Sequence, residues 1–190
     1  KVFILDAEGN PLQHVTKPEA AIIDEKFDYR PAKAEIDSGG ILYVLSTNCY
    51  SGALQFDSKG EFMGFYGSED VDVTFEILLR NFWKDLLSDA ANKGMARTVP
   101  VEFISLCIDR KDFVFTIRRG GEAVTGQVRK LNAKGDNVLD ETKRFGDHVT
   151  EIQLKDLAID DEGFIYTTTA TATVEKELRV RKLNAAGTNT

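Results

Sequence analysis

Three polar residues, Arg30, Glu102 and Gln153, recur at spacings that suggest one shared position in a repeated structure. Glu102 follows Arg30 by 102 − 30 = 72 residues, and Gln153 follows Glu102 by 153 − 102 = 51. A guanidinium, a carboxylate and an amide at one place can orient a small ligand by hydrogen bonding. The alternative is that these residues are polar only because they begin strands close to solvent. Both interpretations require that the chain repeats.

Two predicted loops carry further side chains suited to binding. Asn48 and Tyr50 lie in one loop, and Arg118 and Arg119 lie in another. The arginines can hold a carboxylate or a phosphate, and Tyr50 can stack on a sugar or an aromatic group. The alternative is that both are ordinary solvated loops. Binding residues usually lie on loops that vary over a rigid scaffold, so these four residues are candidates.

A five-residue turn motif, which contains Asp or Asn and ends in Gly, occurs four times and establishes the repeat. Asp6 and Asp57 are 57 − 6 = 51 residues apart, and Asn132 and Asn184 are 184 − 132 = 52 apart. The middle interval is 132 − 57 = 75, which exceeds 51 by 24 and indicates an insertion. A fixed period of roughly 50 residues is typical of stacked units such as propeller blades.

A second turn alternates with the first, over residues 36–43, 108–115 and 159–166. It consists of an apolar residue, Asp, two loop residues, Gly or Asp, and then an apolar strand. Asp112 stands where the other two copies have Gly, and Asp tolerates the left-handed region of the backbone better than most residues. Each copy is therefore predicted to be a tight turn between antiparallel strands.

The segments between these turns are rich in Phe, Tyr, Val, Ile and Thr, and they predict short antiparallel strands, four in each unit. A parallel α/β sheet is excluded because it needs a helix after nearly every strand. The predicted strands are 2–5 and 11–15, then 31–36, 41–46, 51–56 and 61–66, then 102–108, 113–117, 126–131 and 137–145, and finally 155–159, 164–169 and 178–183.

These units resemble NHL repeats, whose blades follow an Asp-x-x-Gly turn, an apolar strand and a Phe-Asp-x-x-Gly turn. The resemblance covers about residues 1–70 and 100–190, and it is to bacterial NHL-repeat propellers with a helical insertion between two blades. It implies an all-β propeller of four-stranded antiparallel blades of the six-bladed type, with about three blades present. It also implies an exported, extracytoplasmic bacterial protein.

A single partial propeller is therefore expected over residues 1–190. Because the chain holds too few units to close a ring, two blade faces are expected to be uncovered, and they either form a homodimer or meet blades outside this segment. The expected parts are the last two strands of a blade (1–20), a blade (28–67), a helical insertion (68–99), a second blade (100–147) and an incomplete blade (150–190).

The insertion predicts an α-helix near residues 74–91, on the same face of the propeller as the variable loops. Its apolar residues recur at steps of three and four, as on one face of a helix. That face is expected to pack on the propeller, and the alternative is that it packs on a partner. Trp83 lies off this stripe and is the candidate contact with a partner. The stripe comprises Phe75, Leu78, Leu79, Phe82, Leu86 and Ala90.

Composition weighs against several functional classes. The chain has 24 basic and 31 acidic side chains, a formal charge of −7, which disfavours a nucleic-acid partner. No apolar run approaches the ~18 residues that cross a membrane, so no membrane span is expected in this segment. The two histidines and two cysteines lack the close spacing of a zinc site, and no cofactor is expected.

The predicted function is a non-enzymatic binding or interaction module. Its ligand is an unknown protein or a small molecule such as a carbohydrate, bound by the inserted helix and the loops between second and third strands. One alternative, from the resemblance to six-bladed lactonases, is a calcium-dependent lactonase or esterase. Calcium takes six to eight oxygens, and Glu102 is the single carboxylate among the three residues at the strand starts. The other alternative is a structural unit that self-assembles.

Overall fold

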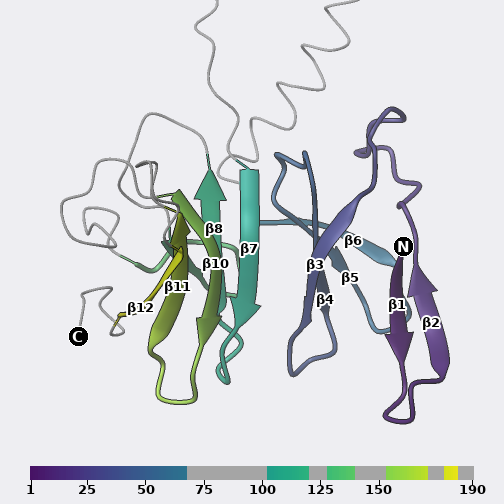
Figure 1. Ribbon diagram of the computed structural model, residues 1–190. Coiled ribbons are helices and arrows are strands. Elements are labelled where there is room, and N and C mark those ends of the chain that lie inside the picture. The colour runs from purple at the N-terminus through teal and green to yellow at the C-terminus, as the bar shows by residue number, and fades with distance from the viewer. Residues whose placement is uncertain (68–101, 120–127, 140–152, 171–177, 184–190) are drawn as a thin grey trace, which may run out of the picture.

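The computed structural model describes residues 1–67, 102–119, 128–139, 153–170 and 178–183 (Figure 1). Within these residues every regular element is a β-strand, and the strands form four antiparallel sheets, none of which closes on itself. The all-β class is therefore confirmed. The predicted helix at 74–91, including Trp83, lies outside the described residues.

We name the four sheets A to D in chain order, and within each sheet the strands also pair in chain order. Sheet A contains β1 (Val2–Leu5) and β2 (Pro11–Val15). Sheet B contains β3 (Pro31–Ile36), β4 (Leu42–Ser46), β5 (Ala53–Phe56) and β6 (Phe62–Tyr66). Sheet C contains β7 (Glu102–Ile108), β8 (Val114–Arg119) and β9 (Val128–Leu131), and sheet D contains β10 (Gln153–Ile159), β11 (Ile165–Ala170) and β12 (Leu178–Leu183).

These strands confirm the predicted ones, with ends that differ by two residues or fewer. The predicted strand at 137–145 falls mostly outside the described residues. Its first residue, Asn137, forms an isolated antiparallel bridge with Leu131 of β9. The alternation of apolar residues and turns was therefore sufficient to locate the strands, because both signals are local.

The repeated turns share one hydrogen-bonding pattern, which Asp37 illustrates. The Asp37 N–H donates to the carbonyl of Ile41 (3.0 Å), and the Asp37 Oδ1 accepts the N–H of Ile41 (2.8 Å). Gly40, at φ 82°, donates back to the Asp37 carbonyl (3.1 Å). Both predicted turn types are confirmed, because the same bonds form at Asp6, Asp57, Asp109, Asn132 and Asp160.

Asp112 adopts the left-handed conformation predicted for it, with φ at 60°. Its carboxylate also accepts hydrogen bonds from the backbone N–H (2.9 Å) and the hydroxyl (2.5 Å) of Ser38, which lies in the equivalent turn of sheet B. In the next pair of turns, Arg110 of sheet C forms an ion pair with Asp161 of sheet D. Turns of neighbouring sheets are therefore joined side by side.

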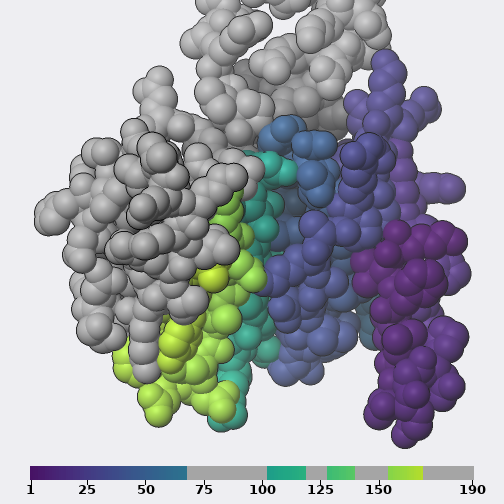
Figure 2. All heavy atoms as spheres, in the orientation of Figure 1, coloured from purple at the N-terminus to yellow at the C-terminus, as the bar shows by residue number. Residues whose placement is uncertain are grey.

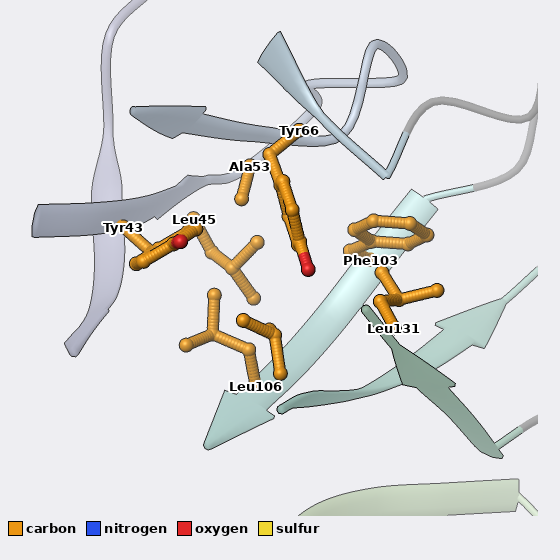
Figure 3. Packing of buried hydrophobic residues seen from close by; sticks show 8 residues of the cluster. Tyr43, Leu45, Ala53, Tyr66, Phe103, Leu106 and Leu131 are labelled. Atoms are coloured by element: carbon orange, nitrogen blue, oxygen red, sulfur yellow. The ribbon is translucent and has the colours of Figure 1, made fainter. Parts of the chain in front are cut away.

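The sheets pack face against face in chain order, from right to left in Figure 1 and across the surface in Figure 2. One apolar cluster lies between each pair of neighbours, and β4 is buried along its whole length. Figure 3 shows the cluster between sheets B and C, where Tyr66 and Leu45 face Phe103 and Leu106. Sheets B and C are therefore each packed between two others, as expected for stacked repeats.

The first strand of sheets B, C and D contains a β-bulge at the same point of the repeat. The register shifts between Pro31 and Lys33 in β3, between Phe103 and Ser105 in β7, and between Leu154 and Asp156 in β10. These bulges were not predicted from the sequence. A bulge inserts one residue and changes the direction of the next side chain. Because the bulge recurs at the same point in three sheets, the three residues that follow it point in equivalent directions.

Candidate functional site

The residues that follow the three bulges, Lys33, Ser105 and Asp156, meet in one hydrogen-bonded group, which we call the polar triad. The Lys33 ammonium donates to the Ser105 Oγ (3.0 Å) and to the Asp156 Oδ1 (2.8 Å). The Ser105 hydroxyl donates to the same Asp156 oxygen (2.5 Å). The first strands of sheets B, C and D must lie close together for these contacts to form.

The polar triad carries a paired positive and negative charge. Burial raises the pKa of Asp156, but the hydrogen bonds from Lys33, Ser105 and the Leu157 N–H more than offset this, and the pKa lies below its usual value. Asp156 is therefore ionised at neutral pH and forms an ion pair with the Lys33 ammonium (2.8 Å). Ser105 is only 1% exposed, so it is the buried member of the group.

Serine, lysine and aspartate can together perform nucleophilic hydrolysis, but this arrangement does not favour it. A serine nucleophile must reach its substrate and give its proton to a nearby base. Ser105 is buried, and the Lys33 side chain beside it donates hydrogen bonds to the Ser105 Oγ and to Asp156, so it is not placed as a base for the serine. The polar triad instead joins three sheets.

Two further ionisable groups lie near the polar triad on the same faces of the first strands. Burial raises the pKa of Glu35, two residues after Lys33, and the Asp156 charge adds to that rise while Lys33 opposes it. Burial also raises the pKa of Cys107 to about 12 and that of Cys49 to about 11. Neither thiol is therefore a nucleophile at neutral pH, since thiolates carry that reactivity.

A second group of polar residues lies where the first strands begin, at the edge opposite the tight Asp turns. We call this the loop edge, defined by Arg30, Asn48, Tyr50, Glu102 and Arg119, and it is the upper edge in Figure 1. The Asn48 N–H of sheet B donates to the Glu102 Oε1 of sheet C (2.8 Å). The backbone of Arg119 in β8 lies opposite that of Glu102 in β7 in the strand register.

Backbone contacts fix Arg30 and the loop after β4 to each other. The Arg30 carbonyl accepts the Thr47 N–H (2.9 Å), and the Arg30 N–H donates to the Ser46 Oγ (2.9 Å). Asn48 has φ at 62°, which Asn tolerates better than most residues. Cys49 is buried and contacts the Gly52 carbonyl through its sulfur (3.4 Å), which leaves Tyr50 exposed at the tip.

The predicted site residues are therefore partly assembled. Arg30, Asn48, Tyr50 and Glu102 lie at the loop edge, but the Arg30 guanidinium pairs with Asp28 (2.6 Å). Arg118 ends β8 together with Arg119, and Gln153 begins β10 opposite Ala170. Trp83 lies outside the described residues.

The polar triad was not predicted, although its spacing is present in the sequence. The intervals 105 − 33 = 72 and 156 − 105 = 51 equal those that identified Arg30, Glu102 and Gln153. Applying the same offsets three residues further along each strand finds the triad. It was not found because the three residues have different chemistry, so no motif repeats.

The described residues do not fit the calcium site of the lactonase alternative. Within them, no group of three or more His, Cys, Asp or Glu residues is placed to hold a metal ion. The Asp156 carboxylate is occupied by the Lys33 ammonium, and Glu102 accepts a backbone N–H. In the same part of the chain, no helix has the length and apolarity to cross a membrane.

Comparison with known proteins does not assign the chain to a family: no family model matches it, and no curated protein is significantly similar to it.

Proposed function

We propose that this chain is part of an NHL-type β-propeller that serves as a non-enzymatic binding module, with its ligand site at the loop edge. The propeller assignment is supported by the repeated turns, the apolar cluster between each pair of neighbouring sheets, and the contact among three first strands. In a propeller the first strands of successive blades surround the central axis, and the contact of three first strands in the polar triad supports such an arrangement.

The observation that supports a binding site at the loop edge is that the two edges of the sheets differ in which side chains are available to a ligand. At the opposite edge, the Asp and Asn side chains of the turns are engaged in local hydrogen bonds. At the loop edge, Tyr50 is exposed on a loop that buried Cys49 and the Asn48–Glu102 contact hold in place. A rigid loop with an exposed aromatic ring needs little ordering when a ligand binds.

The chemistry of this edge suits a carbohydrate. Sugars stack their apolar faces on aromatic rings and offer hydroxyl groups to amide, guanidinium and carboxylate partners. Tyr50 supplies the ring, and Asn48, Arg30 and Glu102 supply the hydrogen-bonding groups nearby. Hydrolysis is disfavoured, because the polar triad lacks an accessible nucleophile.

A glycan array probed with the labelled chain tests this proposal, followed by isothermal titration calorimetry with the best soluble oligosaccharide. Tyr50→Ala is expected to weaken binding at least tenfold with an unchanged melting temperature. Met63→Ala, on β6, removes a side chain of comparable exposure and is expected to bind normally. Absence of binding to any glycan, or an equal loss in both variants, would contradict a carbohydrate site at the loop edge.

A further inference from the structure

Equivalent apolar positions on the first strands of sheets B and C differ in burial. The offset of 72 residues places Ala34 and Ile36 of β3 at the positions of Leu106 and Ile108 of β7. Leu106 is 0% exposed, and Ile108 packs against the same cluster. Ile36 is 59% exposed, and Ala34 is exposed as well. The same face of the repeat is thus covered in sheet C and uncovered in sheet B.

This difference in burial arises because the neighbouring sheet on that side is complete for sheet C and incomplete for sheet B. Leu106 and Ile108 face sheet B, which has its own first and second strands, β3 and β4. Ala34 and Ile36 pair with Val44 and Leu42, whose side chains face sheet A. Sheet A has only two strands, so it covers Leu42 and Val44 of β4 but leaves the side of β3 that carries Ala34 and Ile36 uncovered.

The repeat identifies which strands sheet A contains. The offset of 51 residues places Val2 at the position of Ala53 and Pro11 at that of Phe62, so β1 and β2 correspond to β5 and β6. The equivalents of β1 in the other sheets are β5, β9 and β12. Each has an inner edge, which faces the first strand of its sheet, and this edge pairs with β4, β8 or β11. Among the described strands β1 pairs with β2 alone, so its inner edge presents backbone groups without a strand partner.

We infer that the inner edge of β1 and the strip formed by Ala34 and Ile36 together bind a β-hairpin of the repeat's own pattern. The second strand of that hairpin pairs antiparallel with β1, and its first strand packs on β3. The apolar contact between sheets A and B already includes Leu42 and Val44 of β4. The hairpin extends this interface from β4 to the neighbouring strand β3. This docking surface is separate from the loop edge.

A second copy of the described residues does not supply this hairpin. In each copy the strand pairs with the required pattern are β3–β4, β7–β8 and β10–β11. The second strand of each pair is already bonded on its outer side, to β5, β9 or β12. The partner is therefore a different segment, with two apolar strands around an Asp-x-x-Gly turn.

The test uses a fluorescent synthetic peptide of residues 31–52 as the probe, because it copies the β3–β4 hairpin and ends just before the residue equivalent to Val2. Fluorescence anisotropy with the full chain is expected to show saturable binding at one peptide per chain. Ile36→Lys in the protein is expected to weaken binding at least tenfold. Met63→Lys is the matched control, since Met63 is 56% exposed on β6, and it is expected to bind like the unaltered chain.

A second experiment fuses residues 31–52 in register ahead of Val2. The covalent link makes the binding intramolecular, so the entropic cost of bringing two molecules together is removed. The fusion is expected to raise the melting temperature and to slow amide exchange in β1, whereas a scrambled insert does neither. The inference is overturned if neither the peptide nor the fusion produces its effect, or if Ile36→Lys and Met63→Lys weaken binding equally. It is also overturned if sedimentation shows self-association that Ile36→Lys abolishes, because the occupant is then a second copy.

Discussion

Sheets A and B place similar residues at equivalent positions and differ in what covers them. Phe3 and Leu5 of β1 are 62% and 53% exposed, whereas Leu54 and Phe56, 51 residues later in β5, are 0% and 1% exposed. The local sequence and the strand are alike in both sheets. Burial in a stacked repeat is therefore set by the neighbouring unit and not by the residue type, and most of the stability must lie where two units meet.

The largest expected effect comes from replacing a leucine by alanine, once at a buried position of sheet B and once at an exposed position of sheet A. Leu54→Ala removes a fully buried side chain and is expected to lower the free energy of unfolding by about 2–5 kcal/mol. Leu5→Ala removes an exposed side chain and is expected to change it by less than about 0.5 kcal/mol. Urea unfolding followed by circular dichroism measures both, and equal losses would show that sheet A is as well packed as sheet B.

The polar triad allows a second comparison, between a buried hydroxyl that joins sheets and one in a turn. Ser105→Ala leaves the Lys33 and Asp156 charges without their buried partner and is expected to cost about 1–2 kcal/mol. Ser58→Ala, at an exposed turn position, is the control and is expected to have almost no effect. A neutral Ser105→Ala would mean that the sheets hold together by apolar packing alone.

Acid should weaken the junction of sheets B, C and D through Asp156. Its folded pKa is lowered, so its stabilising contribution is complete above the unfolded value of about 3.9 and is lost as the pH falls through the folded value. Asp156→Asn is therefore expected to be less stable than the unaltered chain at pH 7. The expected loss is only about 1 kcal/mol, because the Asp156 side chain is largely exposed and solvent weakens its ion pair. Urea midpoints that stay equally far apart at pH 7 and pH 2.5 would contradict this.

Glu35 should produce the smallest effect, with the opposite sign. Its folded pKa is raised, so its ionised form destabilises the fold at neutral pH, and this cost disappears as the pH falls below the unfolded value of about 4.3. Glu35→Gln is expected to be slightly more stable at pH 7 and equal to the unaltered chain near pH 3.5. A loss of stability at pH 7 would show that the Glu35 charge is favourable beside Lys33.

The strands and turns could be predicted from the sequence because their causes are local. An Asp or Asn that bonds the backbone within four residues, followed by Gly or Asp112 in the left-handed region, leaves a readable pattern. The bulges depend on how the first and second strands of each sheet pair, and they leave no residue motif in the sequence. The polar triad is spaced by the repeat, but its three residues differ in chemistry and meet only when strands from three sheets come together. The contact of Glu102 with the Asn48 N–H was also missed, although both residues were candidates, since a backbone donor leaves no pattern in the sequence.

The Lys33–Asp156 contact has a consequence for the order in which the molecule assembles. It joins residues 156 − 33 = 123 apart, so it closes a long stretch of chain that contains all of sheet C. A contact of that separation is entropically costly until the intervening sheets are docked. We expect this ion pair to form last during folding, so a crosslink between these two positions would capture only chains in which all three sheets have already come together.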